Sequence, residues 1–159
     1  MTIANSPVEA YELQRVTTAQ RQGFSLFCIN AEGDTPGFVY TIGMAQHQLP
    51  ELMMFFTDDG ASTPGMVASV AQRLIAGLQR FDRITLLRAA TSRPINAGDS
   101  QVTAEFLRGD DYSHALQAYL TRAARYRGEL GAPRGVLVLN HEDVPSFQQV
   151  RCSRMLAVS

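Results

Sequence analysis

A short and almost entirely apolar segment, Leu52–Thr57 (LMMFFT), constrains the fold of this chain more than any other feature. Its apolar and aromatic content is typical of a β-strand. Side chains of a strand point alternately to the two faces of its sheet, so a strand that is apolar at nearly every position needs cover on both faces. We therefore predict that this segment is a central strand of a sheet covered on both sides.

The strongest helical pattern in the chain follows this strand and opens at Thr63-Pro64. Its apolar residues recur at helical spacing and form one broad face: Val67, Val70, Ala71, Leu74, Ile75 and Leu78. Such a face predicts a helix packed on a sheet. A more polar helix is expected from Ser6 to about Gln22, because Ser6 can cap its start and Gly23 can end it.

The remaining elements are read from shorter patterns. Helical character is expected over Ser113–Glu129, with Arg122 and Arg125 on a solvated face, and a polar loop over Thr91–Ser100. Further strands are expected at Phe24–Ala31, Phe38–Ile42, Ile84–Ala89, Val102–Leu107 and Gly135–Asn140.

These elements give an α+β fold class with a mixed, mostly antiparallel sheet of about five or six strands packed by two or three helices. The first two strands are expected to be antiparallel neighbours. A right-handed crossover is expected to make the Leu52 and Ile84 strands parallel. We assign residues 1–149 to a single domain and residues 150–159 to a C-terminal tail.

Composition narrows the function classes. The chain of 159 residues has a net charge of -1, which argues against broad binding to nucleic acid. Its 14 basic residues are all arginine, so it has no lysine for Schiff-base chemistry. No signal peptide or membrane span is visible, and Cys28 is expected to pack inside its apolar strand, so we expect a cytoplasmic protein without membrane contact.

The loop between the second and third expected strands gathers the densest set of reactive side chains. We assign Tyr40, Thr41 and Gly43 to ligand binding, because a glycine turn can direct backbone N–H groups at a ligand. His47 and Glu51 are the candidate catalytic pair. Structural roles stay open: the histidine bonded to a carbonyl, and the carboxylate satisfying backbone N–H groups.

A second candidate cluster directly follows the last expected strand, at His141-Glu142-Asp143. We add His141 and Asp143 to the ligand-binding candidates, with a solvated acidic turn as the alternative. Adjacent residues of an extended segment point in opposite directions, and no spaced His/Cys motif is present, so no metal and no cofactor are expected.

One stretch carries a family resemblance. The run Gly37–Met44, followed by His47 and Pro50-Glu51-Leu52, resembles the bacterial family called domain of unknown function 4262. A closing apolar strand followed by Asp143 and Pro145 is also similar, and the resemblance spans about residues 23–147. It implies no established reaction, ligand or partner.

Three functions fit these patterns. The first is a module that binds a small polar molecule or a partner protein through the loop from Tyr40 to Glu51. The alternatives are a hydrolase or transferase with His47 as general base oriented by Glu51 or Asp143, and a phage or bacterial conflict protein acting through protein contact. Whether the chain is an enzyme stays open, and a homodimer is the commonest assembly for such a domain.

Overall fold

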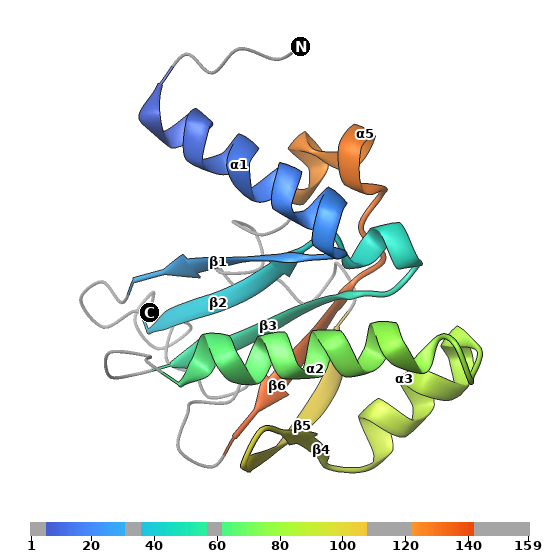
Figure 1. Cartoon of the computed structure of the whole chain (residues 1–159). Helices are drawn as coiled ribbons and strands as arrows, with labels where there is room; N and C mark the ends of the chain where they lie inside the picture. Colours follow the sequence, from blue (N-terminus) through green and yellow to red (C-terminus); the bar gives the residue numbers. More distant parts are fainter. Residues whose placement is uncertain (1–5, 31–35, 57–61, 108–121, 142–159) are drawn as a thin grey trace, which may run out of the picture.

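The computed structural model is built around one six-stranded mixed sheet (Figure 1). It describes residues 6–30, 36–56, 62–107 and 122–141. The strands lie in the order β1-β2-β3-β6-β5-β4, with bounds β1 (Ser25–Ile29), β2 (Gly37–Ile42), β3 (Glu51–Phe56), β4 (Ile95–Ala97), β5 (Ser100–Leu107) and β6 (Val136–Asn140). The α+β fold class expected from the sequence is confirmed.

The sheet is antiparallel except at its centre, where β3 and β6 run parallel. Every residue of β3 is buried, which confirms that its unbroken apolar pattern marks a central strand covered on both faces. The predicted antiparallel pairing of β1 with β2 is also confirmed.

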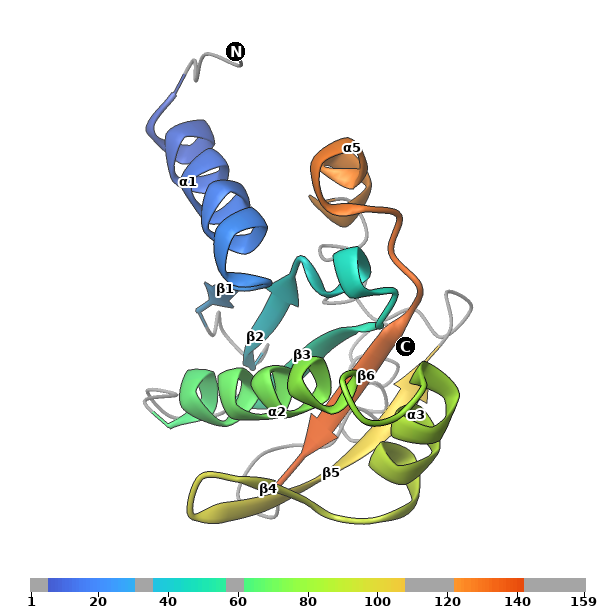
Figure 2. The ribbon, with the colours of Figure 1, turned by 45° about the vertical axis from the view of Figure 1, so that its right-hand side comes forward.

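Helices lie on both sides of the sheet (Figure 2). On one side are α1 (Pro7–Gln22) and α5 (Arg127–Leu130), and on the other are α2 (Thr63–Gly77) and α3 (Arg83–Ser92). Ser6 caps α1 by accepting a hydrogen bond from Glu9 N, and Gly23 ends that helix in the left-handed region, as the sequence predicts.

Two apolar cores follow from this layering. The core under α1 and α5 contains alternate residues of the central strands, among them Tyr40, Met53 and Val138. The core under α2 contains their sequence neighbours, such as Val39, Met54 and Leu139, together with the apolar face of the helix. The alternation of side chains along each strand is what sends neighbours to opposite cores.

The strand predicted at Ile84–Ala89 is wrong, because this segment lies in α3. Asp82 caps that helix by accepting a hydrogen bond from Thr85 N at 2.7 Å, which favours helical over extended backbone. The predicted parallel crossover between the Leu52 and Ile84 strands is therefore also wrong. The strand parallel to β3 is β6, more than half the chain away from it.

Three further segments differ, at least in part, from the sequence-based prediction. The predicted loop Thr91–Ser100 contains β4, which forms a hairpin with β5. Cys28 is exposed, because β1 is the edge strand of the sheet. Of the helix predicted at Ser113–Glu129, residues 113–121 lie outside the described residues, residues 122–125 are helical, and α5 follows a turn at Tyr126.

The C-terminal tail predicted at residues 150–159 also lies outside the described residues. Within the described part of the chain, every helix is too short or too polar to cross a lipid bilayer.

Candidate functional site

Glu51, at the start of β3, holds together the loop that the sequence singles out. Its side chain is buried, and its carboxylate accepts hydrogen bonds from Thr41 Oγ1 at 3.0 Å, Met44 N at 3.0 Å and Ala45 N at 3.1 Å. Thr41 Oγ1 in turn accepts a hydrogen bond from Leu52 N at 2.9 Å. The loop thus uses Thr41 and Glu51 to satisfy each other and the local backbone.

The local backbone explains why these donors converge on one carboxylate. Gly43 lies in the left-handed region, with φ of 102°, and turns the chain from β2 into the short 3-10 helix η1 (Met44–His47). The first N–H groups of a helix have no partner within it, so a carboxylate placed there satisfies them. Burial raises the pKa of Glu51 to about 7, although the hydrogen bonds from Met44 N, Thr41 and Ala45 N partly oppose that rise.

The turn itself demands glycine. A Cβ at position 43 would lie 2.9 Å from Ala19 Cβ. Any residue there would also have to keep a positive φ, which L-residues disfavour. We expect Gly43→Ala to lower the free energy of unfolding by about 2 kcal/mol, measured by urea denaturation. The matched control is Gly65→Ala in α2, where a Cβ meets nothing within 4 Å. In the control, the free energy of unfolding should rise by about 0.5–1 kcal/mol. Equal effects of the two substitutions would contradict the requirement for glycine at position 43.

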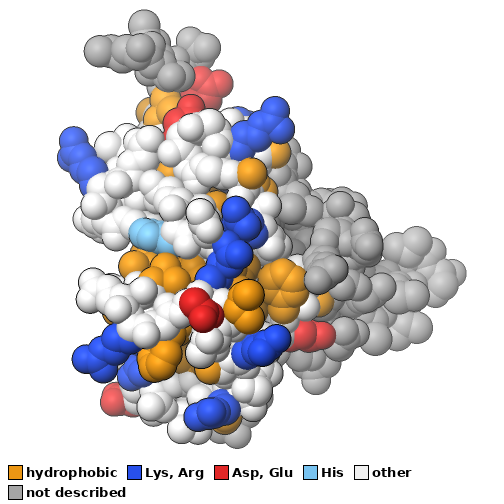
Figure 3. All heavy atoms as spheres, turned by 90° about the vertical axis from the view of Figure 1, so that its right-hand side faces the viewer, with side chains coloured by type: hydrophobic (Ala, Val, Ile, Leu, Met, Phe, Trp, Pro, Cys, Tyr) orange, Lys and Arg blue, Asp and Glu red, His pale blue; other side chains and the backbone are white. Residues whose placement is uncertain are grey.

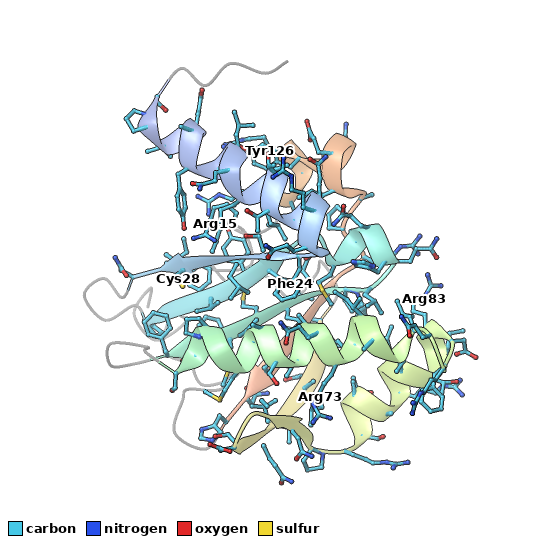
Figure 4. The ribbon with its side chains drawn as sticks, in the orientation of Figure 1. Arg15, Phe24, Cys28, Arg73, Arg83 and Tyr126 are labelled. Atoms are coloured by element: carbon cyan, nitrogen blue, oxygen red, sulfur yellow. The ribbon has the colours of Figure 1, made fainter. Side chains whose placement is uncertain are left out.

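His47, the other candidate catalytic residue, fastens η1 to the end of α1. Its Nε2 lies 3.0 Å from the carbonyl oxygen of Gly23. The next residue, Gln48, has a φ of 60°, and its side-chain oxygen accepts a hydrogen bond from Arg83 Nη1 at 2.9 Å. Figure 4 shows Arg83 reaching from the α2–α3 corner towards this turn. These contacts hold the path of the loop between two helices.

The space at Glu51 is too small for a substrate. A cavity of about 10 Å³ is lined by Gly43, Glu51, Tyr126 and apolar neighbours, and this is room for about one water molecule. Among the described residues, the hydrogen bonds of His47 and Glu51 go to other partners and do not join the two side chains. In the described loop, the side chains of Thr41, His47 and Glu51 therefore hold the backbone in its conformation.

Tyr40 belongs to a separate polar network that sequence reasoning missed. Its hydroxyl accepts a hydrogen bond from Arg122, whose guanidinium also lies 4.6 Å from the centroid of the Phe27 ring. The centre of the network is Glu12, a buried carboxylate on α1 that pairs with Arg122 Nε at 3.1 Å and Arg125 Nη1 at 2.9 Å. Arg122 is therefore not part of the solvated helix face that the sequence predicts.

Tyr126 completes this network from the segment just before α5. Its hydroxyl donates a hydrogen bond of 2.5 Å to Glu12 Oε2, and Figure 4 shows the residue beside α1. Burial works to raise the pKa of Glu12, but the Tyr126 hydrogen bond and the positive charges of Arg122 and Arg125 lower it overall. Burial raises the pKa of Tyr40 to about 12, so its hydroxyl keeps its proton. The network joins α1 to residues 122–126 on the same side of the sheet.

An open groove lies at the other end of this sheet face. It has a volume of about 780 Å³ and lies between the β4–β5 hairpin and the end of β6. Val102 and Leu139 point into the core under α2, so Thr103 and Asn140, which follow them, point to the opposite face. Thr103 and Asn140 are register partners on β5 and β6, which places their side chains next to each other in the groove.

One atom of the groove lacks the contact that its chemistry requires. Asn140 Oδ1 is buried and, within the described structure, accepts no hydrogen bond. A buried acceptor without a donor costs about 1–3 kcal/mol. His141, a candidate from the sequence, lines the same groove, whereas Asp143 lies outside the described residues. The structure thus separates His141 from the Tyr40–Glu51 loop and places it beside polar residues that the sequence did not mark.

Charge and metal-binding groups are distributed without one dominant cluster on the surface shown in Figure 3. Arginine side chains lie scattered over this face, with hydrophobic side chains between them. No group of three or more His, Cys, Asp or Glu side chains suited to a metal ion occurs among residues 6–30, 36–56, 62–107 and 122–141.

The described residues form an α+β domain. The loop held by Glu51 lies at one end of its sheet, and the groove lined by Thr103 and Asn140 lies at the other. No protein-family model matches this chain, and comparisons with curated proteins and with solved structures find no match. The resemblance to domain of unknown function 4262 therefore stays an expectation from the sequence.

Proposed function

We propose that this chain is a small-molecule-binding domain whose site is the groove between the β4–β5 hairpin and the end of β6. The observation that carries the proposal is the buried Asn140 Oδ1 without a hydrogen-bond donor, inside a groove of about 780 Å³. A volume of this size lies within the range of about 300–1,000 Å³ typical of small-molecule sites. A ligand donor at Asn140 would supply the missing hydrogen bond.

The proposal keeps the binding function expected from the sequence but moves its location. The side chains of Thr41 and Glu51 are buried and bonded to the loop itself, so they are occupied in holding its shape. The groove, in contrast, offers a partly buried amide and imidazole at Asn140 and His141 beside the exposed hydroxyl of Thr103. Polar groups held on rigid strands around an open volume are suited to fixing the orientation of a ligand.

A groove-filling substitution tests this proposal. Thr103 is exposed on β5, so Thr103→Trp would fill the groove while keeping a residue that strands accept. We expect wild-type protein to show a ligand-dependent rise in Tm within a panel of polar metabolites sorted by charge. The same compound should give little or no shift with Thr103→Trp.

The matched control is Thr17→Trp, at an exposed position of α1. This control should keep the full ligand response, because α1 packs against β1, the edge strand on the side of the sheet opposite to β4. An undiminished response of Thr103→Trp, or the absence of any response of wild-type protein across all charge classes, would overturn the proposal.

A further inference from the structure

The chemistry of the groove also narrows the class of its ligand. This inference rests on the proposed binding function and adds the charge and hydrogen-bonding character of the bound group. Three observations bear on it: the orientation of Asn140 beside Thr103, the charge carried by the hairpin turn, and the residue types along the groove wall.

The first observation fixes where a donor is required. Asn140 is the last residue of β6, and its side chain shares a sheet face with Thr103. A side-chain amide has an oxygen that only accepts hydrogen bonds and a nitrogen that only donates them. Because the buried atom without a partner in the described structure is the oxygen, the group that completes it must carry an N–H or O–H.

Asp99 gives the groove a negative charge at the hairpin turn. Gly98, with φ of 68°, forms the tight turn of the β4–β5 hairpin together with Asp99, and Asp99 lines the groove. A carboxylate at the rim attracts cations and repels anions. Among the described residues of the groove wall there is no arginine, although arginine supplies all 14 basic residues of the chain.

The rest of the described groove wall carries hydroxyl, amide and imidazole groups beside two apolar residues, Pro94 and Val102. Gln101 and Ser100 lie on the same strand as Thr103, and Gln101 Nε2 already donates a hydrogen bond to Asn96 Oδ1 at 3.2 Å. These amide and hydroxyl groups can accept a hydrogen bond from a ligand that carries no negative charge. Among the described lining residues, a phosphate or carboxylate group would meet the Asp99 carboxylate and no arginine.

From these observations we infer that the groove binds a small linear molecule with two basic groups, of which one lies near Asp99 and the other, an amino or guanidino group, donates an N–H to Asn140 Oδ1. Two groups are needed because Asp99 lies four residues before Thr103, the register partner of Asn140. The hydroxyl of Thr103 lies beside this contact and is available to the same group. The Asp99 carboxylate would repel the negative charge of an anionic metabolite of similar size.

Titration calorimetry with four linear probes of similar size tests this inference. The probes are agmatine, 1,4-diaminobutane, 1,4-butanediol and succinate. We expect the two cations to bind, the diol to bind more weakly, and succinate not to bind. Binding of succinate in preference to both cations would overturn the inference while leaving the groove as the binding site. No binding of any probe, with a response to other compounds that Thr103→Trp removes, would also overturn it and keep the proposed function.

Two substitutions at one position separate the roles of the amide oxygen and nitrogen. Asn140→Asp keeps an acceptor oxygen and adds negative charge, so agmatine should bind with equal or greater affinity. Asn140→Leu removes the acceptor and should weaken agmatine binding by about tenfold or more. Far-UV circular dichroism shows that each variant is folded. Loss of agmatine binding in a folded Asn140→Asp variant would overturn the inference, because the ligand would then depend on the amide nitrogen.

Discussion

Replacing Glu51 with alanine is expected to lower the free energy of unfolding by about 3 kcal/mol, because three buried donors lose their shared acceptor. These donors are Thr41 Oγ1, Met44 N and Ala45 N, all within 3.1 Å of the carboxylate. Urea denaturation at pH 6 measures the loss. The matched control is Glu105→Ala on the exposed surface of β5, which should change stability by less than about 0.5 kcal/mol.

The same carboxylate should make stability depend on pH in a defined window. The pKa of Glu51 is raised from its ordinary 4.5 to about 7, so between these values the folded state holds a proton that the unfolded state has lost. Its contribution to the free energy of unfolding is therefore complete below about pH 4.5 and is lost as the pH rises through about 7.

Glu51→Gln removes this titration and keeps a side chain of the same size. The stability of wild-type protein relative to Glu51→Gln should fall by about 3 kcal/mol between pH 4.5 and pH 8. A constant difference across this range would show that the carboxylate does not change its protonation there.

Replacing Glu12 with alanine is expected to be the second large loss, of about 2–3 kcal/mol at pH 7. The substitution leaves the Tyr126 hydroxyl without its acceptor and Arg122 without its carboxylate partner. Arg125 adds little, because its side chain is 54% exposed and water screens its charge. Urea denaturation at pH 7 measures the effect, with Glu129→Ala at an exposed position of α5 as the control.

The pH dependence of Glu12 should have the opposite sign to that of Glu51. The pKa of Glu12 is lowered in the folded state, so its contribution to stability is complete above its ordinary pKa and is lost as the pH falls below about 4.5. The difference in stability between wild-type protein and Glu12→Gln should therefore shrink on acidification. A difference that grows below pH 4.5 would contradict the ion-pair network.

The sequence was sufficient for elements whose signal is local. The apolar face of α2, the Ser6 cap and Gly23 stop of α1, and the unbroken apolar pattern of β3 each depend on neighbouring residues, and all three are confirmed. The turn at Gly43 is predictable for the same reason, because the left-handed conformation is a property of the glycine's own backbone. The loop it opens was recognisable as a feature, but the roles of its side chains were not.

The α3 segment shows where local patterns mislead. Ile84–Ala89 is apolar enough to suggest a strand, yet Asp82 caps a helix there, and the helix packs against β5. Short apolar runs of this length do not distinguish the two structures, so tertiary packing decides between them. Asp82, which can cap a helix, is a local signal that favours the helix.

Only the tertiary structure reveals two polar clusters: the Glu12 network, for which we predict a large effect on stability, and the Asn140–Thr103 pair of the proposed binding site. Glu12 and Arg122 are 110 residues apart, and Asn140 meets Thr103 through the register of β5 on β6. A residue's own neighbours determine its tendency to form a helix, strand or turn, and the sequence by itself therefore determined the main elements of this chain. The partner of a buried charge or amide depends on strand order and register, which arise from the packing of the whole sheet.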